Sequence, residues 1–277
     1  MKRSPLLNLL LFLLTFVSTL TVGAIHAGVD LVKEPHDIVQ GLPFSLVLLS
    51  ILLVHEFAHY MMSRHHGIEA SLPYFIPAPT LFGTLGAFIS MRSSITTKNA
   101  LMDIGSSGPI AGFLVSVVAI LVGLHYSEVR VIPLQSGEMI VLGDSLLFIA
   151  LTKIVIGSIP DTYGVYLHPV AFAGWIGLFV TSLNLIPAGQ LDGGHIAYAI
   201  LEEKHGGLSN IMIGLLVLLG YFFQGWLVWA ALLFFLGSKH PPILYPEVPL
   251  DPKRKAIGLI ALLIFIVTFI PVPVSIK

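Results

Sequence analysis

The stretch LVLLSILLVHEFAHYMM, from Leu46 to Met62, is an apolar run that carries three ionisable side chains, those of His55, Glu56 and His59. A charged residue at the centre of a membrane helix costs about 2.5–3.5 kcal/mol even on lenient insertion scales. A bound ion would compensate for this cost. We therefore predict that the stretch is a membrane helix with a metal site inside it.

The spacing of the two histidines indicates the kind of site. Residues four apart lie on the same face of a helix, so His55 and His59 direct two imidazoles at one point. A zinc ion there would lie about 2.0–2.1 Å from each nitrogen. Glu56 could reach a metal-bound water without being a ligand, as in the H-E-x-x-H motif of metalloproteases. In a soluble protein this short pattern often occurs by chance on a surface helix and binds no metal. That explanation does not apply inside an apolar run, where the helix has no polar surface.

The composition is that of a polytopic membrane protein. Of 277 residues, 56% are hydrophobic and only 10% are charged, and the mean hydropathy is +0.92. The chain has no cysteine, which excludes disulfides and thiolate ligands, so a metal must be held by histidine and carboxylate. The net charge of −1 gives no reason to expect nucleic acid as a partner.

Six apolar segments are long enough, or nearly long enough, to cross a bilayer. The fold class we predict is an all-α polytopic membrane protein with about six transmembrane helices. The first segment is longer than a signal-peptide core, and we expect it to be retained as a span. The fifth segment is either one tilted span or a hairpin of two short helices. The segments are Pro5–Ile25, Phe44–Ser63, Met102–Leu124, Pro169–Ile186, Leu208–Gly237 and Ala256–Ile270.

Basic residues in short loops predict the orientation. Lys2 and Arg3 precede the first span and place the N-terminus in the cytoplasm. Arg64, Arg92 and Lys98 follow the second span, so the metal site should lie nearer the cytoplasmic face. The basic cluster at 253–255 would be cytoplasmic only if the fifth segment is a hairpin.

The segment Leu72–Met91 between the second and third spans contains three prolines and two glycines, which excludes a helix. It is also too apolar for an ordinary loop, and irregular backbone at membrane depth is tolerated where it lines a cavity. Phe82–Ser90 has the composition of a strand, whose unpaired edge could hold an extended peptide by main-chain hydrogen bonds. The alternative is a re-entrant loop that only fills the bundle.

The fourth span ends in NLIPAGQLDGGH, from Asn184 to His195. Pro187 should break the helix, and the Gly193–Gly194 pair should form a turn before a new helix that starts near His195. Catalytic zinc usually has three protein ligands and a water, and Asp192 is the expected third ligand.

Two further polar residues lie near this third ligand. Asn184 could hydrogen-bond a ligand or donate to a developing oxyanion, and the alternative is a hydrogen bond between helices. His195 is in excess of a three-ligand site, and we place it near the metal or at the cytoplasmic surface. Small residues from Gly105 to Gly112 should let the third span pack closely on the H-E-x-x-H helix.

Together these motifs resemble the site-2 protease family of intramembrane zinc metalloproteases. The resemblance rests on His55–His59, Gly83–Ala87, Gly108–Pro109 and the run from Asn184 to Gly194. The segment Pro73–Gly112 is similar to the branch that contains the chloroplast EGY-type proteases and their prokaryotic relatives.

The resemblance implies a three-helix catalytic core with one Zn²⁺ held by His55, His59 and Asp192, and Glu56 as the catalytic base. It also implies a membrane-level β element beside the substrate. The residues that it suggests for substrate or oxyanion binding are Asn184, Gly83, Thr84, Leu85, Gly86 and Ala87. The implied substrates are single-span or other membrane proteins in the lipid bilayer, and the implied location is a prokaryotic cell membrane.

We expect one integral membrane protease domain over residues 1–277. Within it, 1–40 would be a peripheral first span, 41–195 the catalytic core and 196–277 the C-terminal spans. The sequence does not determine the oligomeric state. The alternative function is a membrane zinc transporter that uses a helix-borne H-E-x-x-H site, which would require further ligands on other spans.

Overall fold

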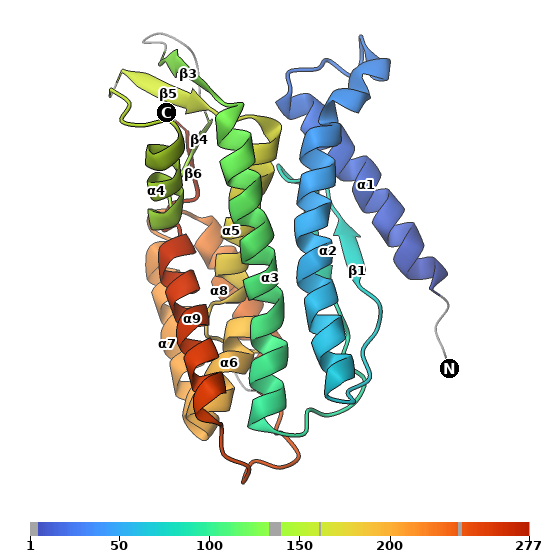
Figure 1. Cartoon of the computed structure of the whole chain (residues 1–277), viewed down its shortest axis with the longest axis vertical. Helices are drawn as coiled ribbons and strands as arrows, with labels where there is room; N and C mark the ends of the chain where they lie inside the picture. Colours follow the sequence, from blue (N-terminus) through green and yellow to red (C-terminus); the bar gives the residue numbers. More distant parts are fainter. Residues whose placement is uncertain (1–4, 133–139, 161, 238–239, 277) are drawn as a thin grey trace.

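The computed structural model describes residues 5–132, 140–160, 162–237 and 240–276. The described chain is mostly helical, and its longest helices stand side by side (Figure 1). Two short 3-10 helices, Pro35–Gly41 and Glu202–Lys204, precede α2 and α7. The α-helices are α1 (Leu6–His26), α2 (Leu42–His65), α3 (Lys98–His125), α4 (Leu146–Val155), α5 (Pro169–Asn184), α6 (Asp192–Leu201), α7 (His205–Leu219), α8 (Gly225–Leu236) and α9 (Pro252–Thr268).

Three described helices, α1, α2 and α3, are long and apolar enough to cross a membrane. They correspond to the first three predicted spans. Helices α5, α7, α8 and α9 have 16, 15, 12 and 17 residues. An upright span needs about 20 residues, because the hydrocarbon core is about 30 Å thick. The structure therefore confirms a mostly helical protein with three candidate spans, and it does not confirm a count of six.

The fifth apolar segment is a hairpin of two helices. α7 ends at Leu219 and α8 begins at Gly225. A side chain at Gly220 would lie 2.4 Å from Cδ2 of Leu227, so this glycine lets the turn close tightly on the second helix. The indole of Trp226 is buried and donates to the Pro271 carbonyl at 2.7 Å. Of the two arrangements that the sequence left open, the structure has the hairpin.

Helices α2, α3 and α5 pack against one another and form the centre of the molecule. Their shared core includes Leu48 from α2, Ile120 from α3 and Trp175 from α5, each at most 1% exposed. Thr97 caps α3 by accepting from the Ala100 N–H at 3.2 Å, which fixes where the third span begins. The core helices thus form a rigid support for side chains that point between them.

The strands form three separate two-stranded antiparallel sheets. Within Phe82–Ser90 the structure has β2, so the prediction of a strand is confirmed. β2 pairs with β1, and Tyr74 lies opposite Phe88 and Phe75 opposite Ala87. The other two sheets lie together at the opposite end of the molecule from the start of α3 (Figure 1). The strands are β1 (Tyr74–Pro77), β2 (Thr84–Phe88), β3 (Glu128–Val131), β4 (Ile140–Leu142), β5 (Tyr163–Tyr166) and β6 (Val274–Ile276).

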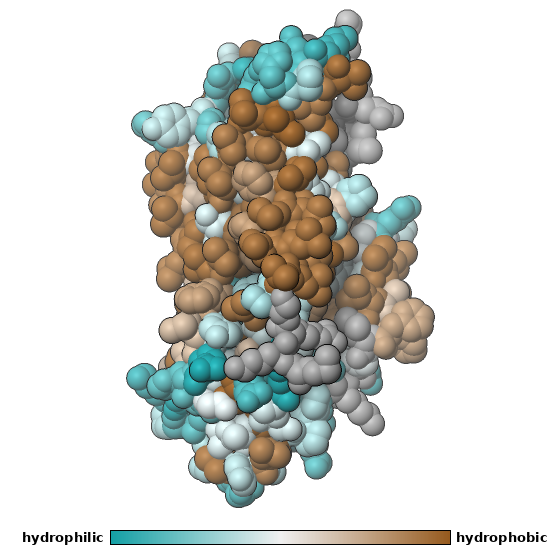
Figure 2. Space-filling view, turned by 90° about the vertical axis from the view of Figure 1, so that its right-hand side faces the viewer, coloured by the Kyte–Doolittle hydropathy of each residue, from teal (hydrophilic) through white to brown (hydrophobic). Residues whose placement is uncertain are grey.

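The surface on the α1 side carries a broad hydrophobic band with hydrophilic residues at both ends (Figure 2). The first turns of α3 and α9 meet at one of these ends, where Arg254 donates from Nε and Nη2 to the Asp103 carboxylate at 2.6–2.9 Å. His66, which follows α2, also contacts Asp103, at 2.9 Å. The basic cluster at 253–255 therefore lies at the end where α2 finishes, as the hairpin requires.

Candidate metal centre

The two histidines of α2 converge as their spacing predicts. Both are buried, with 4% of His55 and 5% of His59 exposed. Their rings meet edge to face, and their Nε2 atoms are 3.1 Å apart. Nδ1 of His59 donates to the Ile104 carbonyl of α3 at 2.7 Å, because a carbonyl can only accept. The Nε2 lone pair of His59 is thus directed at the site, and a second element holds the ring in place.

Asp192 completes the group from a distant part of the chain. Its Oδ2 lies 3.2 Å from His55 Nε2 and 3.3 Å from His59 Nε2. The helix that carries it begins at Asp192, so the predicted start near His195 is wrong. A side chain at Gly193 would lie 2.1 Å from the Leu185 carbonyl. The glycine pair therefore serves close packing of the first turn of α6 on the preceding loop, and it does not form a separate turn.

The donor set fits a zinc ion. Tetrahedral zinc with bonds of about 2.0–2.1 Å holds its ligand atoms about 3.3 Å apart, and the three separations here are 3.1, 3.2 and 3.3 Å. A carboxylate oxygen and a His59 nitrogen with its lone pair inward would repel each other without a cation between them. Within the described part of the chain, this is the one group of three histidine or acidic side chains close enough to hold a metal.

Glu56 lies beside the group without joining it. Its Oε1 is 4.0 Å from His55 Nε2, and 6% of the residue is exposed. The backbone N–H of Ile89, just after β2, is directed at its carboxylate. This position suits a base that acts on a metal ligand through one water, because it is near the metal donors and outside bonding distance of them.

Two glycines of α3 provide the space for the histidines. A side chain at Gly108 would lie 2.0 Å from His59 Nε2, and one at Gly112 would lie 3.0 Å from His55 Nδ1. The sequence indicated that small residues would allow close packing here. It did not indicate that the imidazoles themselves occupy the space.

Asn184 also reaches the site, at the last residue of α5. Its Nδ2 is 3.3 Å from His55 Nε2, and the residue is half-buried. The structure thus brings together five of the predicted site residues, which are His55, Glu56, His59, Asn184 and Asp192.

The five residues from Gly83 to Ala87 lie in the β1–β2 hairpin (residues 72–90) and differ in their surroundings. Gly83 and Thr84 are buried, and the Thr84 hydroxyl donates to the Ile76 carbonyl at 2.8 Å. Gly86 has a positive φ of 98°, where the pairing with β1 becomes irregular. Leu85 is 69% exposed, and Ala87 is half-buried.

The edges of β2 follow from its hydrogen bonds. Ser90 donates to the Ser71 hydroxyl at 2.9 Å and accepts from the Ser71 N–H at 3.0 Å, so its main chain faces the β1 side. Because backbone groups alternate along a strand, those of Ile89 and Ala87 face the opposite edge. Among the described residues no strand pairs with that edge, and Glu56 lies at it.

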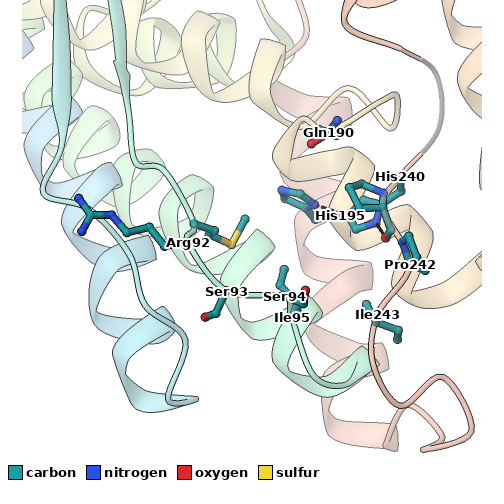
Figure 3. Close-up of a pocket in the computed structure, with 11 residues that line it drawn as sticks. Arg92, Ser93, Ser94, Ile95, Gln190, His195, His240, Pro242 and Ile243 are labelled. Carbon is teal, nitrogen blue, oxygen red and sulfur yellow. Dashed lines mark hydrogen bonds between the residues drawn. The ribbon is translucent and has the colours of Figure 1, made fainter. Parts of the chain in front are cut away.

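A cavity of about 320 Å³ lies one helical turn from Asp192. His195 forms part of its wall one helical turn after Asp192, and it is 8% exposed, so it does not lie at the surface. His195 Nδ1 is 2.6 Å from His240 Nε2, and the two imidazoles lie together opposite Arg92 and Ser93 (Figure 3). Burial lowers the pKa of His240 to about 4, so this ring is neutral at pH 7. No sequence motif indicated this pair, because 45 residues separate its members.

Comparisons with known proteins identify the family of the chain. The model of peptidase family M50 matches residues 43–224, which include all three side chains of the candidate metal group. "Probable zinc metalloprotease EGY2, chloroplastic" of Arabidopsis thaliana is 30% identical over 242 residues, 84% of this chain and 42% of the relative. "Probable zinc metalloprotease EGY1, chloroplastic" of the same organism is 31% identical over 291 residues, 95% of this chain and 52% of the relative.

The chain thus spans about half the length of the curated relatives that it matches. No solved structure gives a significant match.

Proposed function

Because the chain belongs to peptidase family M50, we propose that it is an intramembrane zinc metalloprotease that hydrolyses peptide bonds within or near membrane segments of its substrates. The observation that carries the proposal is the placement of Glu56 beside a group of two histidines and one aspartate in the apolar interior. The names of the chloroplast relatives support the same activity.

His55, His59 and Asp192 would hold the ion. Zinc held there would supply a Lewis acid that polarises the scissile carbonyl and makes the attacking water more acidic. The site is preorganised, because the Ile104 carbonyl fixes the His59 ring and the packing of α6 fixes Asp192.

Glu56 acts as the base. Its carboxylate takes the proton of the attacking water and later delivers it to the leaving amine. Asn184, whose amide group lies at the rim of the metal group, donates a hydrogen bond to the substrate carbonyl as negative charge develops on its oxygen.

The unpaired edge of β2 binds the substrate backbone. Ala87 directs its N–H and C=O to the same edge as Ile89, whose N–H is directed at Glu56, so an extended peptide paired there would pass the base. Gly83, Thr84, Leu85 and Gly86 shape the hairpin that presents this edge. A substrate helix must unwind locally to pair, because its own hydrogen bonds otherwise occupy the main chain.

We place the protein in a prokaryotic cell membrane as a multi-pass protein, with the shorter apolar helices completing about six spans. Basic residues at the end where α2 finishes and α9 begins favour a metal site nearer the cytoplasmic face. Single-span membrane proteins are the substrates that this architecture suits. A zinc transporter has no support, since the described residues hold a single candidate group of three ligands.

The test compares the wild type with Glu56→Gln, which removes the base and no ligand. Both purified proteins should contain zinc, and only the wild type should cleave membrane-protein substrates. In cells, single-span proteins should accumulate in membranes that contain the variant. Substantial cleavage by purified Glu56→Gln would contradict the role of Glu56, and identical membrane proteomes would contradict the protease assignment.

A further inference from the structure

α1 lies outside the segment matched by the family model, and most of its surface is apolar and exposed. Its polar side chains are therefore unexpected, because polar groups in a membrane helix are costly unless they have partners. Asn8, Ser18 and His26 lie along one side of the helix, together with Phe12 and Thr19. Asn8, Phe12, Thr19 and His26 are four or seven residues apart, which is the spacing of one helix face, and Ser18 lies at the edge of that face beside Thr19.

Each of the three polar residues contacts main-chain carbonyls of the β1–β2 hairpin. Asn8 Nδ2 donates to Leu72 O at 3.0 Å and to Pro73 O at 2.9 Å. Ser18 Oγ donates to Ala78 O at 3.3 Å. His26 Nε2 donates to Leu81 O at 2.9 Å.

These contacts extend along the whole first half of the hairpin. From Asn8 to His26 the helix rises by about 27 Å, and the carbonyls that it contacts run from Leu72, before β1, to Leu81, in the turn after β1. The rings of Phe12 and Phe75 meet edge to face, with their centroids 5.0 Å apart. At Gly83 the hairpin backbone touches the helix, since a side chain there would lie 2.8 Å from Cα of Thr19. Figure 1 shows β1 in the space between α1 and α2.

α1 is also fastened to the helix that carries the metal donors. Thr19 Oγ1 lies 2.6 Å from Ser45 Oγ of α2, and both residues are fully buried. A side chain at Gly23 would lie 2.7 Å from the Gly41 carbonyl, so the two backbones are in contact where α2 begins. α1 therefore connects the hairpin with α2 along a second path, distinct from the contact between Ile89 and Glu56.

We propose that α1 is a positioning element that holds the β1–β2 hairpin in register with the metal site, through hydrogen bonds from Asn8, Ser18 and His26 to hairpin carbonyls. In hydrocarbon these carbonyls have no water as an alternative partner, so the donors on α1 determine where the hairpin lies. The role of the hairpin in binding substrate rests on the proposed function. The attachment of the hairpin to α1 does not.

The experiment removes the donors and follows the hairpin directly. The variants are Asn8→Leu, His26→Leu and the double variant, with Thr21→Val as a matched control, because the Thr21 hydroxyl donates only within its own helix at Val17. His26→Gln keeps a donor at a similar reach. Hydrogen exchange of peptides from residues 72–90 is compared with that of peptides from α2 and α3, and zinc content, KM and kcat are measured on the same samples.

We expect exchange in residues 72–90 to be about tenfold faster in each single variant, with α2, α3 and zinc content unchanged. KM for a membrane substrate should rise several-fold, and His26→Gln and Thr21→Val should behave like the wild type. Unchanged exchange in the hairpin would overturn the proposal. Equally faster hydrogen exchange in α2 and α3, or a fall in kcat at constant KM, would also overturn the proposal. Either result would mean that α1 stabilises the helices in general and does not position the hairpin. If the wild type cleaves no substrate, the protease assignment fails, and the exchange data still decide the role of α1.

Discussion

Replacement of Gly108 by alanine should disable the metal site although none of the three proposed ligands is replaced. The new methyl group would lie 2.0 Å from Nε2 of His59 and 2.4 Å from its Cδ2. To reach ordinary contact at 3.4 Å the ring must retreat by about 1.4 Å, whereas a metal–nitrogen bond tolerates about 0.2 Å. α3 cannot move away instead, because a side chain at Gly123 would already lie 2.1 Å from the Ala171 nitrogen of α5.

The expected result is a fall in zinc affinity of about 100-fold, or about 2.7 kcal/mol, at the upper end of the effects seen when the surroundings of a metal ligand are changed. The assay is zinc content per chain after equilibration of purified protein with a graded series of chelator concentrations. Gly112→Ala should fall between Gly108→Ala and the wild type, because its methyl group would lie 3.0 Å from His55 Nδ1.

Gly214→Ala in α7 is the matched control, since nothing lies within 4 Å of the added carbon. It should leave zinc affinity unchanged and stabilise its helix by up to about 1 kcal/mol. Wild-type zinc affinity in Gly108→Ala would refute the reasoning, because it would mean that His59 does not bind metal from the position seen here.

Three further results are expected. Asp192→Ala should lose zinc at chelator concentrations that leave the wild type loaded, because only two donors remain; full zinc content and full activity would reduce Asp192 to a helix-start residue. Ala87→Pro removes an N–H from the unpaired edge of β2, so KM for a membrane substrate should rise at constant zinc content, and an unchanged KM would count against substrate pairing at this edge. Arg254→Met should lower the free energy of unfolding by about 2 kcal/mol in a thermal unfolding measurement, because Asp103 is only 11% exposed and loses its charged donor. The control is Lys253→Met at the exposed neighbouring residue, which should change the free energy of unfolding by less than about 0.5 kcal/mol.

The sequence by itself predicted the class of protein and the three side chains that the structure brings together as a candidate metal site. An apolar run interrupted by His55, Glu56 and His59 has few physical explanations, because hydrocarbon penalises unpartnered charge. The spacing of four residues fixed the convergence of the imidazoles, since that relation is a local property of a helix. Asp192 was predicted for a similar reason: it is an ionisable residue at the end of an apolar segment. A strand within Phe82–Ser90 was also predicted correctly from its glycines and β-forming residues.

Other features depended on contacts between distant segments. A local pattern cannot reveal that Ile104 orients His59, that Gly108 and Gly112 make room for the imidazoles, or that His195 meets His240. The start of α6 was predicted wrongly because Gly193 is needed for close packing on the Leu185 carbonyl, a contact that the local sequence does not indicate. The choice between a tilted span and a hairpin in the fifth segment likewise required the packing of α7 on α8. Sequence patterns indicate which local conformation is favoured and which side chains are buried, because both depend on neighbouring residues. Only the tertiary structure decides which buried surfaces meet.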